Sequence, residues 1–248
     1  MDLDQLIAKA VEDPSNEPEL FDRILQATLY VHAPKKPTGM KLSLVQFRTP
    51  QGVMAIPIFT DRPKAEFAGR GNVRIISLQG RQLLSATIGA TVVINPNDNW
   101  CILYPEEIRA LLRGHEIGRN PANLTPSAPL ELRPSRDSDP QLTEAIVTSL
   151  SSIEHALDAW LTEADDEDGG PISRYVVVVA AEAAHHERIA RSLTLSLHNI
   201  GKSLERIVDV TFIEPGGRHD QWLNGNRESL IYRRTWLPGL TSGIRGSA

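Results

Sequence analysis

The sequence has little that would suit it to a place outside the cell or in a membrane. Its 248 residues include a single cysteine, Cys101, so no internal disulfide can form and a reduced setting is expected. No basic cluster adjoins Cys101, so we interpret it as a small buried strand residue and not as a reactive thiol. The most apolar run, Tyr175 to Ala181, is far shorter than the roughly 20 residues that cross a bilayer, and the acidic N-terminus lacks the pattern of a secretory signal. We expect a cytoplasmic protein with no membrane partner.

An excess of positive charge is also missing. The sequence has 26 lysines and arginines against 31 aspartates and glutamates, which gives a formal net charge of -5. The basic residues do not collect into a run. Proteins that bind nucleic acid concentrate basic side chains on one surface, because phosphate charges dominate their affinity. We therefore expect no nucleic-acid partner.

The short motifs of common catalytic and nucleotide sites are absent as well. There is no GxGxxG, no GxSxG, no HExxH and no paired-cysteine pattern. Gly201-Lys202-Ser203 resembles the end of a phosphate-binding loop, but it lacks the upstream glycine and follows a predicted helix instead of a strand. The sequence therefore favours a non-catalytic protein without a cofactor.

The first half contains alternating strand and helix patterns, which predict a mixed sheet with helices. Apolar residues spaced by three and four predict a helix between Glu17 and Leu29, and the turn residues at 49–52 predict a β-hairpin. Pro57 has no backbone N–H to donate to a neighbouring strand. We therefore expect its strand to lie at a sheet edge, or position 57 to be directed away from its neighbouring strand. The predicted strands are Leu29 to Val31, Lys41 to Arg48, Val53 to Phe59, Val73 to Ser77, Thr91 to Ile94 and Trp100 to Leu103; the further helices are Arg62 to Ala68, Gln79 to Ile88, and one from Pro105 that stops at Gly114.

The second half contains the clearest amphipathic pattern. Its apolar stripe predicts one helix from Leu142 to Trp160 or Leu161, the acidic run Glu163 to Asp168 predicts a solvated loop, and Tyr175 to Ala181 predicts a central strand. The other predicted elements are a helix from Glu182 to Ile200 and strands at Leu130 to Leu132, Glu205 to Ile213, Arg218 to Leu223 and Glu228 to Arg233. We predict an α+β fold of two small mixed α/β domains, residues 1–116 and 130–235, each with a mostly antiparallel or mixed sheet flanked by helices, joined by a linker at 117–129 and followed by a tail at 236–248.

Two polar corners are the candidate ligand site. The first follows a strand at Phe59, Thr60 and Asp61, and the second is Asn95-Pro96-Asn97-Asp98, of which Asn95, Asn97 and Asp98 carry polar side chains. Each corner comes directly after an apolar strand, where the end of a sheet could gather hydroxyl, amide and backbone donors around a ligand. The alternative is that both corners only cap a helix or form a turn, which needs no ligand.

Glu182 and His186 are weak candidates for a metal site. Residues three and four apart share a helix face, so Glu182 with His185 or His186 could supply part of a ligand set. The alternative is a histidine at the edge of the core, because His186 lies three residues before Ile189 on the extension of an apolar stripe.

The order of several landmarks resembles the SseB family, named for enhanced serine sensitivity. The N-terminal landmarks are Thr28-Leu29-Tyr30-Val31, Ile56-Pro57-Ile58-Phe59-Thr60, Gly89-Ala90, Ile94-Asn95-Pro96 and Tyr104-Pro105-Glu106-Glu107-Ile108. The Pro140-opened helix, Val176 to Val179 and Leu230-Ile231-Tyr232-Arg233 are similar to the family's C-terminal domain. Asn97 stands where the family often has glycine after Asn-Pro.

The resemblance implies a bacterial cytoplasmic protein whose biochemical activity is not established. A secretion translocator shares the family's name, but the sequence has no long coiled-coil heptads. Three functional hypotheses remain open: a binding or regulatory protein for a metabolite or another protein, an adaptor or secretion-associated assembly subunit, and a metal-dependent enzyme at Glu182 and His186. The sequence does not fix the oligomeric state.

Overall fold

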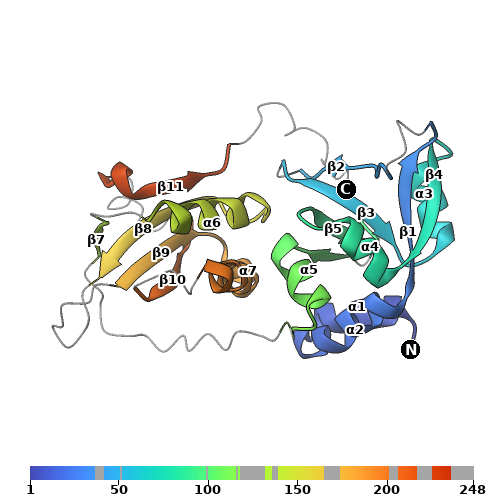
Figure 1. Ribbon diagram of the computed structural model, residues 1–248, viewed down its shortest axis with the longest axis horizontal. Helices are drawn as coiled ribbons and strands as arrows, with labels where there is room; N and C mark the ends of the chain where they lie inside the picture. Colours follow the sequence, from blue (N-terminus) through green and yellow to red (C-terminus); the bar gives the residue numbers. More distant parts are fainter. Residues whose placement is uncertain are drawn as a thin grey trace, which may run out of the picture. The chain divides into compact units, whose positions relative to one another are not determined.

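The structure is a computed structural model with two compact units. It describes residues 1–36, 42–50, 52–98, 100–115, 117, 132–135, 139–164, 174–200, 206–216 and 225–235. One unit comprises Met1–Arg48 and Met54–Asn120, and the other comprises Thr49–Val53 and Pro121–Ala248. Each unit has helices and a mixed sheet, so the predicted α+β class is confirmed (Figure 1).

The sheet of the first unit has the strand order β4-β1-β3-β5-β6, with β2 paired to β3. Strands β3 and β5 are parallel neighbours, and the other pairs are antiparallel. Helix α3 packs against β1, β3 and β4, whereas α4 contacts α2, α5, β1 and β4 (Figure 1). The strands are β1 Thr28–Pro34, β2 Phe47–Arg48, β3 Met54–Phe59, β4 Val73–Gln79, β5 Thr91–Ile94 and β6 Cys101–Leu103; the helices are α1 Leu3–Glu12, η1 Pro14–Asn16, α2 Glu17–Gln26, α3 Arg62–Gly69, α4 Gly80–Ala86 and α5 Pro105–Leu112.

Helix α1 has no counterpart among the predicted elements. It starts with a capping box, in which the Asp2 carboxylate accepts from the Gln5 amide at 2.8 Å and the Gln5 side chain accepts from the Asp2 amide at 3.2 Å. Its buried face consists of Leu6, Ile7 and Ala10, and α1 packs on α2. The first unit therefore begins with a packed helix, whose first turn lies beside the site described below.

The predicted edge position of β3 is wrong, because β3 lies in the middle of the sheet. Pro57 is accommodated between two short ladders: β2 pairs with Met54 and Ala55, and β1 pairs with Ile58 and Phe59. The proline thus falls where neither of these antiparallel partners has a registered residue. A central strand can contain proline when its partners on one side are interrupted there.

Close packing of α2 and α4 depends on Gly80. A Cβ atom added at this glycine would lie 1.7 Å from the Ile24 carbonyl oxygen. The Gly80 amide also donates to the Ala27 carbonyl at 2.8 Å, which fixes the start of α4 at the end of α2. Cys101 is half-buried in β6.

The sheet of the second unit has the strand order β10-β9-β8-β11, with β7 paired to β8. The predicted central strand is confirmed: β9 lies between antiparallel β8 and parallel β10, and every β9 residue after Arg174 is buried. The elements are β7 Arg133–Pro134, α6 Pro140–Ser151, β8 Asp158–Ala164, β9 Arg174–Ala180, η2 Ala183–His185, α7 His186–Ile200, β10 Val208–Ile213, η3 Arg227–Ser229 and β11 Leu230–Arg233.

Two predictions in this unit are wrong. The amphipathic helix ends at Ser151, and Trp160 and Leu161 lie in β8, because a strand buried on both faces is also continuously apolar. Glu163 belongs to β8 and not to a solvated loop, with 4% of its side chain exposed. It accepts from Arg206 at 3.0 Å and from the Ser135 hydroxyl at 2.9 Å.

Several predicted elements lie outside the described residues: most of the linker at 117–129, the acidic residues 165–168, Gly201 to Ser203, the strand Arg218 to Leu223 and the tail at 236–248. Ile117, the described linker residue, is buried. Within the part of the chain that is described, no helix has the length and apolar character needed to cross a membrane.

Candidate functional site

The two polar corners meet at one edge of the first sheet. Strands β3 and β5 are parallel, so their carboxyl ends bring Thr60 and Asn95 together. The Thr60 amide donates to Asn95 Oδ1 at 3.1 Å, and Asn95 Nδ2 donates to Thr60 Oγ1 at 3.0 Å. The Asn95 amide also donates to the Ile58 carbonyl at 2.8 Å, which ties the second corner to the first strand.

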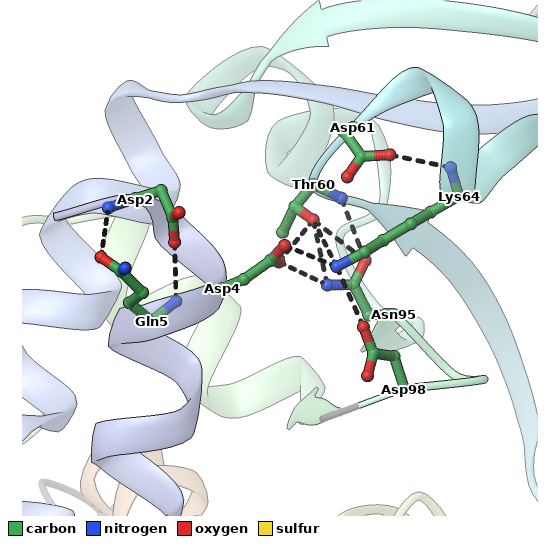
Figure 2. Close-up of polar contacts among 8 residues, drawn as sticks. All are labelled: Asp2, Asp4, Gln5, Thr60, Asp61, Lys64, Asn95 and Asp98. Carbon is green, nitrogen blue, oxygen red and sulfur yellow. Dashed lines mark hydrogen bonds and ion pairs between the residues drawn. The ribbon is translucent and has the colours of Figure 1, made fainter.

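Asp4 and Lys64 complete this cluster, and sequence reasoning missed both. Asp4 Oδ1 accepts from the Thr60 hydroxyl at 2.7 Å and from Asn95 Nδ2 at 2.9 Å (Figure 2). Its other oxygen, Oδ2, accepts from Lys64 Nζ at 2.6 Å. Lys64 Nζ also lies 3.1 Å from Asp98 Oδ2, so one ammonium joins two carboxylates from distant parts of the chain (Figure 2).

Local sequence explains how each side chain reaches the cluster. The capping box at Asp2 starts α1 so that Asp4 lies in its first turn. Asp61 caps α3 by accepting from the Lys64 amide at 2.8 Å, and Pro63 occupies the first turn, where a missing N–H does no harm. Asn95 has φ 51°, a left-handed conformation that asparagine tolerates better than most residues.

The two central charges hold each other in the ionised state. Burial raises the pKa of Asp4. The hydrogen bonds from Lys64, Thr60 and Asn95, together with the Lys64 charge, lower the pKa by more than burial raises it, so it lies below its ordinary value. Burial lowers the pKa of Lys64, but its contacts with Asp4 and Asp98 outweigh this and raise the pKa above its ordinary value. Both groups are therefore charged throughout the neutral range.

A pocket of about 280 Å³ opens beside this cluster. It is lined by Phe59, Pro63, Lys64, Phe67, Asn95, Asn97 and Asp98. Four of the six predicted ligand residues are thus in its wall. Of the other two, Thr60 bonds Asn95, and Asp61 caps α3.

The lining residues that sequence reasoning missed come from α3. Pro63 and Phe67 are four residues apart, so they share a helix face, and Phe67 is 78% exposed. The sequence signal that could have found this wall was a phenylalanine four residues after Pro63, and therefore on the same face of the predicted helix. No local signal connects Asp4 to Thr60, because 56 residues separate them.

The structure does not place Glu182 and His186 on one helix face. Glu182 precedes the short helix η2, and α7 begins only at His186. The observed helix therefore starts four residues later than the predicted one. The His186 ring lies 2.8 Å from the Ala181 carbonyl oxygen and stacks on Phe212 with centroids 4.3 Å apart. These are the contacts of a histidine at the edge of the core.

A neighbouring histidine pair is also unlike a metal site. The rings of His155 and His185 stack with centroids 3.5 Å apart, and His155 Nε2 lies 3.2 Å from Glu154. Burial, followed by the charge of His155, lowers the pKa of His185. Among the described residues, no three His, Cys, Asp or Glu side chains are grouped to hold a metal ion.

Comparison with known proteins supports the resemblance in the first unit. Residues 3–110 match the family model of the SseB protein N-terminal domain. Searches of curated proteins and of solved structures found no match. The matched segment includes Asp4, both polar corners and the whole pocket wall. Residues 3–110 therefore form a domain of the SseB family, and this domain carries the candidate site.

Proposed function

We propose that this protein is a non-catalytic binding or regulatory protein whose ligand occupies the pocket beside β3 and β5. The observation that carries the proposal is that the pocket lies where the carboxyl ends of two parallel strands meet, a common place for ligands in mixed sheets. The SseB resemblance adds the bacterial cytoplasm as the setting. A volume of about 280 Å³ suits a small metabolite or one side chain of a protein partner.

The chemistry of the wall supports binding in preference to catalysis. A general acid or base works best with a pKa near the operating pH, but the pKa values of Asp4 and Lys64 both move away from neutrality. The lining residues include no histidine, cysteine or serine. Their groups are an ammonium, a carboxylate and two amides beside an apolar wall, which recognise a ligand without transforming it.

The wall is also preorganised. Asn95 is 2% exposed, and its side chain bonds Thr60 and Asp4. Its orientation is therefore fixed by the fold. Preorganisation lowers the entropy that binding must overcome, so a small pocket can retain useful affinity.

Filling the pocket tests the proposal. Native mass spectrometry of protein taken gently from its own cytosol is expected to show an added small mass or a bound protein. Asn97→Trp, at an exposed lining position, is expected to abolish this adduct, whereas Gln82→Trp, on the exposed side of α4, keeps it. If Asn97→Trp retains the adduct and still folds, the ligand is not in this pocket.

The exposure of Phe67 favours an adaptor as the second candidate. Phe67 is 78% exposed and lies with Phe59 and Pro63 in the pocket wall, and aromatic side chains are enriched on surfaces that partner proteins cover. In that case Phe67→Ser releases a co-purifying protein, while Ile88→Ser, which removes an exposed side chain outside the pocket, does not. A protein that remains monomeric in its own cytosol contradicts this candidate.

A further inference from the structure

We propose that the pocket beside β3 and β5 selects an uncharged ligand, an apolar body that carries an amide group. This inference rests on the proposed binding function and names the chemical class of the ligand. Its basis is a pocket wall whose two charges are paired with each other, whose surface is mainly apolar, and which includes an exposed carboxamide.

The two charged residues of the wall neutralise each other. Lys64 and Asp98 are the charged lining residues, and Lys64 Nζ lies 3.1 Å from Asp98 Oδ2 (Figure 2). The ammonium also donates to Asp4 at 2.6 Å and to the Thr60 hydroxyl oxygen at 3.5 Å, so its three hydrogens have three acceptors. The lining therefore has no net charge with which to attract an ion of either sign.

An ionic ligand would have to disturb this network. An anion would compete with carboxylates for Lys64, and a cation would compete with Lys64 for Asp98. Asp4 does not offer a free carboxylate, because it lies outside the lining and accepts three hydrogen bonds. A charged group also loses hydration when it enters a mainly apolar pocket. An uncharged ligand avoids both costs.

Three lining residues form an apolar surface for the body of the ligand. Phe59 ends β3, and Pro63 and Phe67 lie four residues apart on α3, so the helix presents them on one face. Phe67 is 78% exposed, and covering its ring with an apolar ligand is favourable in proportion to the area removed from water. The apolar body thus supplies affinity without any charge.

Asn97 supplies the polar contact. The side chain of Asn95 is 2% exposed and is already occupied by Thr60 and Asp4, whereas Asn97 is exposed in the wall. A carboxamide has both a donor and an acceptor, so an amide on the ligand can pair with Asn97 through two hydrogen bonds. A carboxylate can only accept and an ammonium can only donate, so neither matches both groups.

Four probes of nearly equal shape test the ligand class. They are 3-phenylpropionamide, benzylacetone, 3-phenylpropionate and 3-phenylpropylammonium, which end in an amide, a ketone, an anion and a cation. Each is titrated into the 15N-labelled full chain, and the amide shifts of Lys64, Phe67 and Asn97 report the pocket. We expect the amide to bind about threefold tighter than the ketone and about fivefold tighter than either ion.

Variants of the wall locate the selectivity. Asn97→Ala should remove the advantage of the amide over the ketone, whereas Asn72→Ala, at an exposed asparagine outside the pocket, should keep it. Asp98→Asn should raise the affinity of the anion about threefold relative to the amide, and Lys64→Met should do the same for the cation, because each leaves one charge in the lining. Unchanged relative affinities of the ions in both charge variants would overturn the role of the paired charges.

The outcomes separate this inference from the proposed function. If the ketone or either ion binds the pocket as tightly as the amide, the choice of ligand class is overturned while the binding function stands. If no probe shifts the pocket amides, the inference fails, and the adduct experiment decides the proposed function separately. N-acetyl-phenylalanine methylamide, which presents two peptide groups, distinguishes the sources: tighter binding than 3-phenylpropionamide indicates a peptide segment of a partner, and weaker binding indicates a free amide.

Discussion

Asp4 is the side chain whose removal should most weaken the candidate site. It joins the first turn of α1 to both polar corners through Thr60 and Asn95, and to α3 through Lys64. Asp4→Ala removes an acceptor of three hydrogen bonds. Asp4→Asn keeps one oxygen but places amide hydrogens where Lys64 or Asn95 now donates.

The expected loss follows from these contacts and from exposure. A hydrogen bond to a charged group contributes about 1.5–3 kcal/mol when buried. The Asp4 side chain is 42% exposed, so water replaces part of each bond, and Lys64 keeps Asp98 as a partner. We therefore expect Asp4→Ala to lower the free energy of unfolding of the first unit by about 2 kcal/mol and Asp4→Asn by about 1 kcal/mol.

Native-state hydrogen exchange measures this loss for the first unit by itself. The amides of β3 and β5 report the unfolding free energy around both corners. Asp2→Asn is the matched control, because it removes one charge in the same turn but keeps a capping side chain, so its cost should stay below about 0.5 kcal/mol. A loss from Asp4→Ala no larger than that of the control would refute the bridging role.

The same contacts predict an acid dependence. The pKa of Asp4 is lowered in the folded protein, so its ionised contacts stabilise the fold above the unfolded pKa, and this contribution is lost as the pH falls through the folded value. The stability difference between wild type and Asp4→Asn should therefore be constant near neutrality and shrink below about pH 4. If the stability difference changes between pH 6 and 8, another titrating group must cause it, because those pH values lie about two units or more above the ordinary pKa of aspartate.

Three further changes test the packing within each unit. Gly80→Ala should cost about 3 kcal/mol or more in urea unfolding, because its Cβ would meet the Ile24 carbonyl at 1.7 Å, whereas Gly225→Ala, with nothing within 4 Å, should cost little. The pKa of His185 is lowered by burial and by its neighbour, so the second unit should lose stability as the pH falls through about 6.5, and His185→Gln should flatten that slope. Glu163→Ala should destabilise the second unit by about 1–2 kcal/mol in urea, less than a fully buried pair would, because its arginine partners remain partly hydrated; an unchanged midpoint would contradict this.

The sequence predicted the elements whose signals are local. Pro63 and Asp61 mark the start of α3, and the bounds predicted for β5 match the structure. These features depend on neighbours within a few residues, so they can be predicted from the local sequence alone. Helix α1 also had a local signal in its capping box, which our interpretation overlooked.

The errors arose where tertiary packing decided. Trp160 continues the three-and-four spacing of α6, but it lies in β8, because burial on both faces makes a strand look like the apolar face of a helix. Glu163 reads as part of an acidic loop until Arg206 and Ser135 are brought to it from elsewhere in the chain. Such partners have no fixed spacing in the sequence, so they could not be predicted.

The candidate site combines both kinds of information, and this bears on whether the corners are more than caps and turns. Capping accounts for Asp61, and a left-handed turn accounts for Asn95. Neither needs an ammonium placed between two carboxylates, nor Phe67 left 78% exposed beside a pocket. Exposing a large apolar side chain forgoes stability that burial would bring, roughly 1.5–3 kcal/mol for phenylalanine. Recognition of a ligand gives a physical reason for both features, and it predicts that Phe67→Ser weakens ligand binding without lowering the stability of the free protein.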